Sequence, residues 1–116
     1  MKLRVLGTAG AELPNFRPTA LLIDDAVLLD AGTVGAVLNS DEQLFLKAIL
    51  ISHAHHDHIL GIPALAENLA IKNTKNPLVL VSTKEILSVL SRHVFNNVVW
   101  PDFTKIPSVA PVLKYS

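Results

Sequence analysis

The first half of the chain alternates between short apolar runs and polar or glycine-rich segments. Short runs of this kind, bounded by turn residues, are typical of β-strands. Two aspartates, Asp24 and Asp25, separate a pair of these runs, and this spacing predicts a tight hairpin turn between them. The predicted strands are LRVLG (3–7), TALLID (19–24), AVLLDAG (26–32) and AILIS (48–52).

The second half adds helical periodicity. IPALAENLAIK (62–72) has its apolar residues at helical spacing, and STKEILSVLSRHVF (82–95) places its apolar positions on one helix face. Between them, PLVLVS (77–82) predicts another buried strand. Beyond Asn97 the pattern is irregular and rich in proline, and no further element is predicted there. Strands come first and then alternate with helices, which favours an α/β sandwich of a mixed sheet with covering helices.

Two capping boxes predict where helices begin. Ser40 with Gln43 predicts a short helix in SDEQLFLKA, and Ser82 with Glu85 predicts the start of the helix over 82–95. In such a box the serine hydroxyl and the acidic or amide side chain each bind a backbone N–H that has no partner inside the helix.

Composition narrows the classes of function. The chain has 116 residues, of which 50% are hydrophobic, enough for one domain with a real core. Ten basic residues balance ten acidic residues, which argues against bulk binding of nucleic acid or anionic membrane. No apolar run predicts a signal peptide or a membrane span, so a cytoplasmic location is expected. Because cysteine is absent, any metal must be bound by His, Asp or Glu.

Four of the five histidines fall within six positions, in SHAHHDHILG (52–61). His53 and His55 are two apart on the extension of a strand, so both rings can point toward one metal ion. Asp57 and His58 follow where the chain turns toward the next helix, and this turn can direct them to a second ion. The alternative is a histidine-rich surface loop, but such a loop lacks the apolar strand before it and the apolar helix after it.

The chemistry of this cluster suits zinc-like ions, which neutral imidazoles and carboxylates bind at about 2.0–2.2 Å. Two such ions about 3.5–4 Å apart would hold a bridging hydroxide and stabilise the attacking and leaving oxygens of a phosphate ester. His56 is the exception, because side chains alternate in direction along an extended chain and its ring would point away from those of its neighbours. We expect it to face solvent or to support a ligand without binding metal.

Other residues carry weaker indications. Asp30, in LLDAG, ends a buried strand, and we expect it to orient a metal-binding histidine; the alternative is a turn-forming aspartate ahead of Gly32. His93 is expected at the surface of a helix. Trp100 and Phe103 are expected to pack in the core or an interface, and not to stack on a substrate base.

The motifs resemble a known superfamily. HAHHDH fits the H-x-H-x-D-H motif of the metallo-β-lactamase superfamily, and LLDAG resembles its first motif. RVLGTAGAELPNFRPTALLI is similar to the opening of RNase Z-type tRNA 3′-processing endonucleases. HVFNNVVWPDFTKIP (93–107) and ISHAHHDHILGIPALAEN resemble class II cyclic-nucleotide phosphodiesterases, the resemblance that we favour. His56 departs from that group, where leucine is commoner.

The resemblance implies a function and a ligand set. His53 and His55 would bind the first of two divalent metal ions, and Asp57 and His58 the second, with Asp57 also positioning the hydroxide. Zinc is favoured, and manganese or iron would suit the same ligands. The implied reaction is hydrolysis of a phosphodiester substrate, a 3′,5′-cyclic nucleotide, by the metal-bridging hydroxide.

The resemblance also implies that residues 1–116 are the N-terminal half of the αββα metallo-β-lactamase sandwich. The other metal ligands of the family come from a later half, so we expect little or no turnover from this chain alone. The sheet face meant for that half would be exposed, and a second copy or a separate C-terminal half could cover it. The alternatives are an RNase Z-like endonuclease and a non-catalytic metal-binding or self-associating half-domain.

Overall fold

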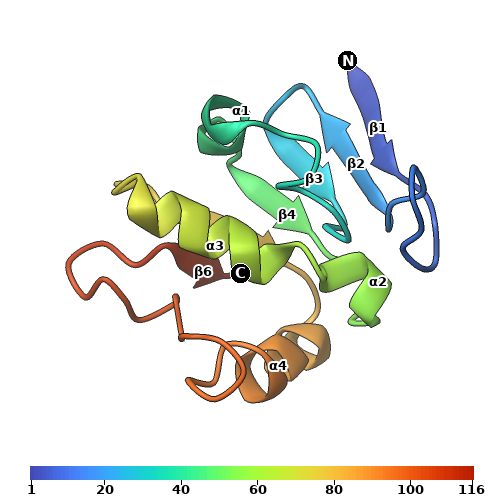
Figure 1. The fold of residues 1–116 in the computed structure, drawn as a ribbon. Coiled ribbons are helices and arrows are strands. Elements are labelled where there is room, and N and C mark those ends of the chain that lie inside the picture. The colour runs from blue at the N-terminus through green and yellow to red at the C-terminus, as the bar shows by residue number, and fades with distance from the viewer.

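The computed structural model describes all residues, 1–116, as one six-stranded mixed sheet with α3 lying across it (Figure 1). Each strand pairs with the one before it in the chain, antiparallel from β1 to β3 and parallel from β3 to β6. The strands are β1 (Leu3–Gly7), β2 (Ala20–Ile23), β3 (Val27–Leu29), β4 (Ala48–Leu50), β5 (Leu78–Val81) and β6 (Leu113–Tyr115), and the helices are α1 (Ser40–Leu44), α2 (His56–Ile59), α3 (Ile62–Ile71) and α4 (Lys84–His93).

The hairpin between β2 and β3 confirms the predicted turn. Asp24 and Asp25 are the first two of three residues between the paired Ile23 and Val27, and both have positive φ angles, 50° and 59°. The Ala26 N–H donates to the Ile23 carbonyl at 3.0 Å, which closes a tight turn. The backbone N–H of Lys2 also donates a hydrogen bond to Asp24 Oδ1, at 2.7 Å. The turn is therefore tied to the start of the neighbouring strand β1.

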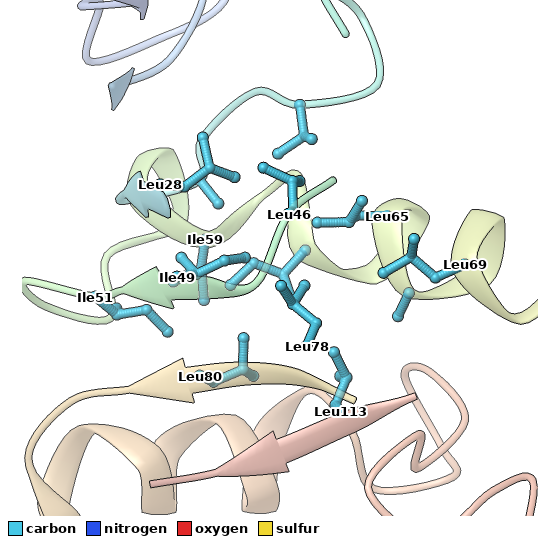
Figure 2. Packing of buried hydrophobic residues seen from close by; sticks show 14 of the residues in the cluster. Leu28, Leu46, Ile49, Ile51, Ile59, Leu65, Leu69, Leu78, Leu80 and Leu113 are labelled. Carbon is cyan, nitrogen blue, oxygen red and sulfur yellow. The ribbon is translucent and has the colours of Figure 1, made fainter. Parts of the chain in front are cut away.

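The core lies between the sheet and α3. Leu28, Ile49 and Leu80 are aligned across three neighbouring strands and are fully buried. From the helix, Leu65 and Leu69 point toward this row, as Figure 2 shows. The helix predicted for residues 62–72 is therefore confirmed, and the apolar residues at helical spacing form its buried face against the sheet.

The opposite side of the sheet is also apolar, but no helix covers it. The neighbouring side chains of β3, β4 and β5 lie in register there, and Leu50 is 39% exposed. A hollow of about 520 Å³ runs over this surface toward Asp30 and Ser52. We call this surface the open face; it consists of Val5, Leu21, Leu29, Leu50 and Val81.

The capping box of α1 begins one residue earlier than predicted. Asn39, and not Ser40, accepts a hydrogen bond from the Glu42 N–H at 2.9 Å, and Glu42 accepts one from the Asn39 N–H at 2.9 Å. Asparagine is at least as good a cap as serine. Glu42 is also held by Arg4 at 2.8 Å, an ion pair that Gln43 could not form. Gln43 is instead buried and donates to the Leu38 carbonyl.

The box predicted for Ser82 and Glu85 does not form. Thr83 caps α4 by accepting a hydrogen bond from the Ile86 N–H, at 3.3 Å. Ser82 still belongs to the end of the strand, where its hydroxyl donates to the Ile51 carbonyl at 2.7 Å. The helix therefore covers Lys84–His93, inside the predicted range.

The irregular C-terminal segment contains a strand that the sequence pattern does not reveal. β6 pairs parallel to β5, with Leu113 opposite Leu78. Before it, Phe103 is buried in the core and Trp100 packs against the core, which confirms their predicted packing role. The longest helices have ten residues, so none is long enough to cross a membrane.

Candidate metal centre

The end of β3 turns sharply at Asp30. This residue has a positive φ of 57°, so the strand ends at Leu29, earlier than the predicted range 26–32. Its backbone N–H still donates to the Leu50 carbonyl at 2.8 Å. The turn leaves Asp30 buried, with its side chain beside the residues that follow β4.

The residues after Asp30 are joined to α2 by backbone contacts. The Ala31 N–H donates to the His58 carbonyl at 2.8 Å, and the Gly61 N–H donates to the Ala31 carbonyl at 2.8 Å. Gly32 lies so close to the Asp57 carbonyl that a Cβ atom would overlap it. The LLDAG segment and the histidine cluster, separated in sequence, thus form one packed unit.

The Asp30 carboxylate connects two parts of the cluster. Its Oδ1 accepts from the Ser52 N–H at 2.8 Å, and its Oδ2 lies 2.7 Å from the Ser52 hydroxyl and 2.8 Å from His58 Nδ1. Burial alone would raise the pKa of Asp30, but hydrogen bonds from Ser52 and His58 outweigh it and lower the pKa. Asp30 is therefore ionised and accepts all three hydrogen bonds.

Three histidine rings gather at the carboxyl end of β4, an edge where α/β sheets commonly bind ligands. The ring centroid of His53 lies 4.7 Å from that of His55 and 4.0 Å from that of His58. His56 is exposed at the start of α2, and His93 is exposed in the last turn of α4. The structure thus brings His53, His55 and His58 together, apart from the other two.

Asp57 and His58 face each other through potential metal-binding atoms. Asp57 Oδ2 lies 3.2 Å from His58 Nε2. Because His58 Nδ1 donates its proton to Asp30, Nε2 of the neutral ring carries a lone pair and lies beside a carboxylate oxygen. Two acceptors this close repel each other, and a proton or a metal ion shared between them would relieve the repulsion. Two ligand atoms at about 2.0–2.2 Å from a tetrahedral ion lie roughly 3.4 Å apart, so the pair fits one shared ion.

The set of ligands is nevertheless incomplete in this conformation. No group of three or more His, Asp or Glu side chains is arranged to hold one metal ion. The donor chemistry fits a divalent metal, but tetrahedral coordination needs rotation of these side chains or additional donors.

Ser52 is the residue of this cluster that sequence reasoning missed. Its hydroxyl lies 2.7 Å from Asp30 Oδ2 and 2.9 Å from His53 Nδ1, between a carboxylate and an imidazole. The only indication in the sequence was the position of Ser52, directly before the histidines at the end of an apolar strand. Serine is common at strand ends, so this position alone does not distinguish it.

Comparison with known proteins connects this arrangement to described families. A family model for "cAMP phosphodiesterases class-II" matches residues 37–115. A 3′,5′-cyclic-nucleotide phosphodiesterase of Schizosaccharomyces pombe is 38% identical over 60 residues, which cover 52% of this chain and 16% of the relative. Ribonuclease Z of Methanococcus maripaludis is 34% identical over 97 residues, which cover 78% of this chain and 31% of the relative.

The fold has a solved counterpart. The crystal structure of unliganded yeast PDE1 superposes with a TM-score of 0.78 at 16% sequence identity, covering 98% of this chain and 49% of that one. The mixed α/β fold predicted from the sequence is thereby confirmed. The chain matches about half of the yeast protein and smaller parts of the other relatives.

Proposed function

The chain belongs to the class-II cyclic-nucleotide phosphodiesterase family of the metallo-β-lactamase superfamily, and from this premise we propose that it forms the metal-binding half of a hydrolase acting on 3′,5′-cyclic nucleotides. The observation that carries the proposal is the pair of facing acceptors, Asp57 Oδ2 and His58 Nε2, 3.2 Å apart. A divalent cation between them would replace the repulsion of two lone pairs with two bonds.

We assign the ligands by position in the cluster. His53 and His55 would bind one ion, and Asp57 and His58 the other, with zinc favoured and manganese or iron suited to the same donors. Such ions would supply a nucleophile derived from water at neutral pH and would stabilise charge on a phosphodiester. Asp30 would hold His58 through Nδ1, which leaves Nε2 as the ligand atom.

The proposal extends to the open face. Its residues form an apolar surface next to the cluster, and Leu50, between Leu29 and Val81, is 39% exposed. A second half-domain packed there would cover this surface and could add the ligands that the cluster lacks. The occupant would be a C-terminal half, with a second copy of this chain as the other outcome. Without such a partner we expect little or no turnover.

Metal content is the first test. The untagged chain, dialysed after purification, is analysed for zinc, manganese and iron per chain, and its mass in solution is measured. Tightly bound metal that is reduced in a His55→Ala variant supports the proposal. His93→Ala is the matched control, because this histidine is exposed and outside the cluster. Equal metal content in the native chain and both variants would overturn the ligand assignment.

An RNase Z-like endonuclease is the second candidate. The match to the Methanococcus maripaludis ribonuclease Z covers 78% of this chain, against 52% for the match to the Schizosaccharomyces pombe phosphodiesterase. A longer protein that joins this chain to a second half is assayed with cyclic AMP and with a precursor tRNA carrying a 3′ trailer. Cleavage of the tRNA alone would favour the endonuclease. Metal binding with no cleavage of either substrate would favour a non-catalytic module.

A further inference from the structure

We propose that Ser52 is a positioning residue that fixes the proton of His53 on Nδ1 and so leaves the lone pair of the neutral ring on Nε2, where a metal ion can bind it. The purpose of this arrangement rests on the proposed function, but the proton position itself does not. The inference comes from the distances around one hydroxyl group, which lies between Asp30 and His53.

The Ser52 hydroxyl has a single proton to give. Asp30 Oδ2 lies 2.7 Å away and, as a carboxylate, can only accept. If the hydroxyl donated to His53 instead, its oxygen would face the carboxylate oxygen at that distance with no proton between them. Donation to Asp30 is therefore required, since charge-assisted hydrogen bonds are the stronger ones.

The remaining contact of the hydroxyl then has a fixed direction. His53 Nδ1 lies 2.9 Å from Ser52 Oγ, whose proton is already committed to Asp30. The oxygen must accept, so Nδ1 of His53 carries the proton, and in the neutral ring Nε2 has the lone pair. His58 has the same tautomer through its direct contact with Asp30. The Asp30 carboxylate thus determines the tautomers of two histidines, that of His58 directly and that of His53 through Ser52.

The backbone keeps the hydroxyl in place. The Ser52 N–H donates to Asp30 Oδ1 at 2.8 Å, in addition to the hydroxyl contact with Oδ2. A Ser52→Ala variant removes the hydroxyl and leaves this backbone hydrogen bond intact. The residue is exposed, so the truncation creates no core cavity. The variant therefore isolates the link from Asp30 to His53.

The direct test reads the proton position by nuclear magnetic resonance. Long-range ¹H–¹⁵N spectra of the metal-free, ¹⁵N-labelled chain are recorded at a pH where the imidazoles are neutral. We expect His53 to be protonated on Nδ1 in the native chain and in Ser52→Thr, and to shift toward Nε2–H in Ser52→Ala. Ser82→Ala is the matched control, because this serine also ends a strand but its hydroxyl binds the Ile51 carbonyl. An Nε2-protonated His53 in the native chain would overturn the inference, whatever the variants do.

A second readout measures zinc affinity by competition with a chromophoric chelator. We expect Ser52→Ala to bind Zn²⁺ about tenfold more weakly than the native chain, and Ser52→Thr to restore the affinity. Unchanged affinity in a variant whose tautomer has shifted would refute the positioning role. A native chain that binds no Zn²⁺, yet shows the expected tautomers, would count against the proposed function and leave the Ser52 link standing.

Discussion

Gly32 packs directly on the backbone carbonyl of Asp57, with no room for a side chain between them. The contact joins the turn after β3 to the helix that carries Asp57 and His58. Because Asp30 precedes Gly32 by two residues, this close packing holds the Asp30 turn beside the helix, where the Asp30 carboxylate lies 2.8 Å from His58 Nδ1. A glycine outside the cluster thereby controls the geometry inside it.

Replacing Gly32 with alanine should therefore damage both the fold and the site. We expect Gly32→Ala to lower the free energy of unfolding by at least about 2 kcal/mol, measured in urea, because the new Cβ would also crowd Pro18 and Thr19. Gly10→Ala is the control: a Cβ at Gly10 meets nothing nearby, and its effect should stay within about 0.5 kcal/mol. Equal stability of the two variants would contradict the packing described.

The two faces of β4 should respond differently to truncation. Ile49→Ala removes a fully buried side chain and should cost about 2–4 kcal/mol in unfolding free energy. Leu50→Ala, on the open face, should cost less than about 1 kcal/mol, since that side chain is 39% exposed. Chemical denaturation of both variants makes the comparison. A similar cost at the two positions would contradict the exposure of the open face in solution.

Tyr115 should make the chain less stable in alkali. Burial raises the pKa of this phenol to about 12, and the charge of Asp102 adds to the effect. In the unfolded chain the phenol loses its proton near pH 10. Stability that depends on the neutral phenol is therefore complete below pH 10 and is lost as the pH rises from about 10 to about 12.

Tyr115→Phe isolates this loss, because lysines that titrate in the same range are common to both chains. Relative to the variant, the native chain should lose up to about 2 kcal/mol of unfolding free energy between pH 10 and 12. At pH 7 the variant should be as stable or about 1 kcal/mol more stable, since the buried Tyr115 hydroxyl has no hydrogen-bond partner in the protein. Parallel alkaline curves for the two chains would count against this reasoning.

Metal stoichiometry should depend on the facing pair. A double variant, Asp57→Ala with His58→Ala, should lose one of two bound ions, because it removes both assigned ligands of that ion. His56→Ala should retain both, since His56 is exposed on the same short helix and lies outside the ring cluster. Elemental analysis after dialysis gives the count. Two tightly bound ions in the double variant would refute the assignment.

Much of the fold could be predicted because its signals are local. The apolar runs that became β2, β4 and β5, and the helical spacing of α3, each follow from neighbouring residues. β6 could not be predicted in this way. Its three residues follow a proline-rich segment, and they form a strand because β5 offers an unpaired edge. The predicted N-cap of α1 was one residue too late for a similar reason. Asn39 caps the helix together with Glu42, and Glu42 is held in place by Arg4 from a distant strand.

In the site, too, only the features that depend on neighbouring residues could be predicted from the sequence. A carboxylate that ends a buried strand needs partners, so a role for Asp30 beside a histidine could be predicted, and the structure places it 2.8 Å from His58 Nδ1. Which histidine it meets depends on the turn at Asp30 and could not be read from sequence. Ser52 acts through a hydroxyl between two groups that are brought together only by folding. Metal binding by His53, His55, Asp57 and His58 stays a prediction.

The order of the strands bears on how this site could arise during folding. Because every strand pairs with its predecessor, no pairing has to wait for a segment from farther along the chain. The turn at Asp30, the end of β4 and the α2 turn all precede β5 in the sequence. A growing chain could therefore assemble the carboxylate and its histidines before the last strands are added, and an ion captured at that stage would act as a nucleus for the rest.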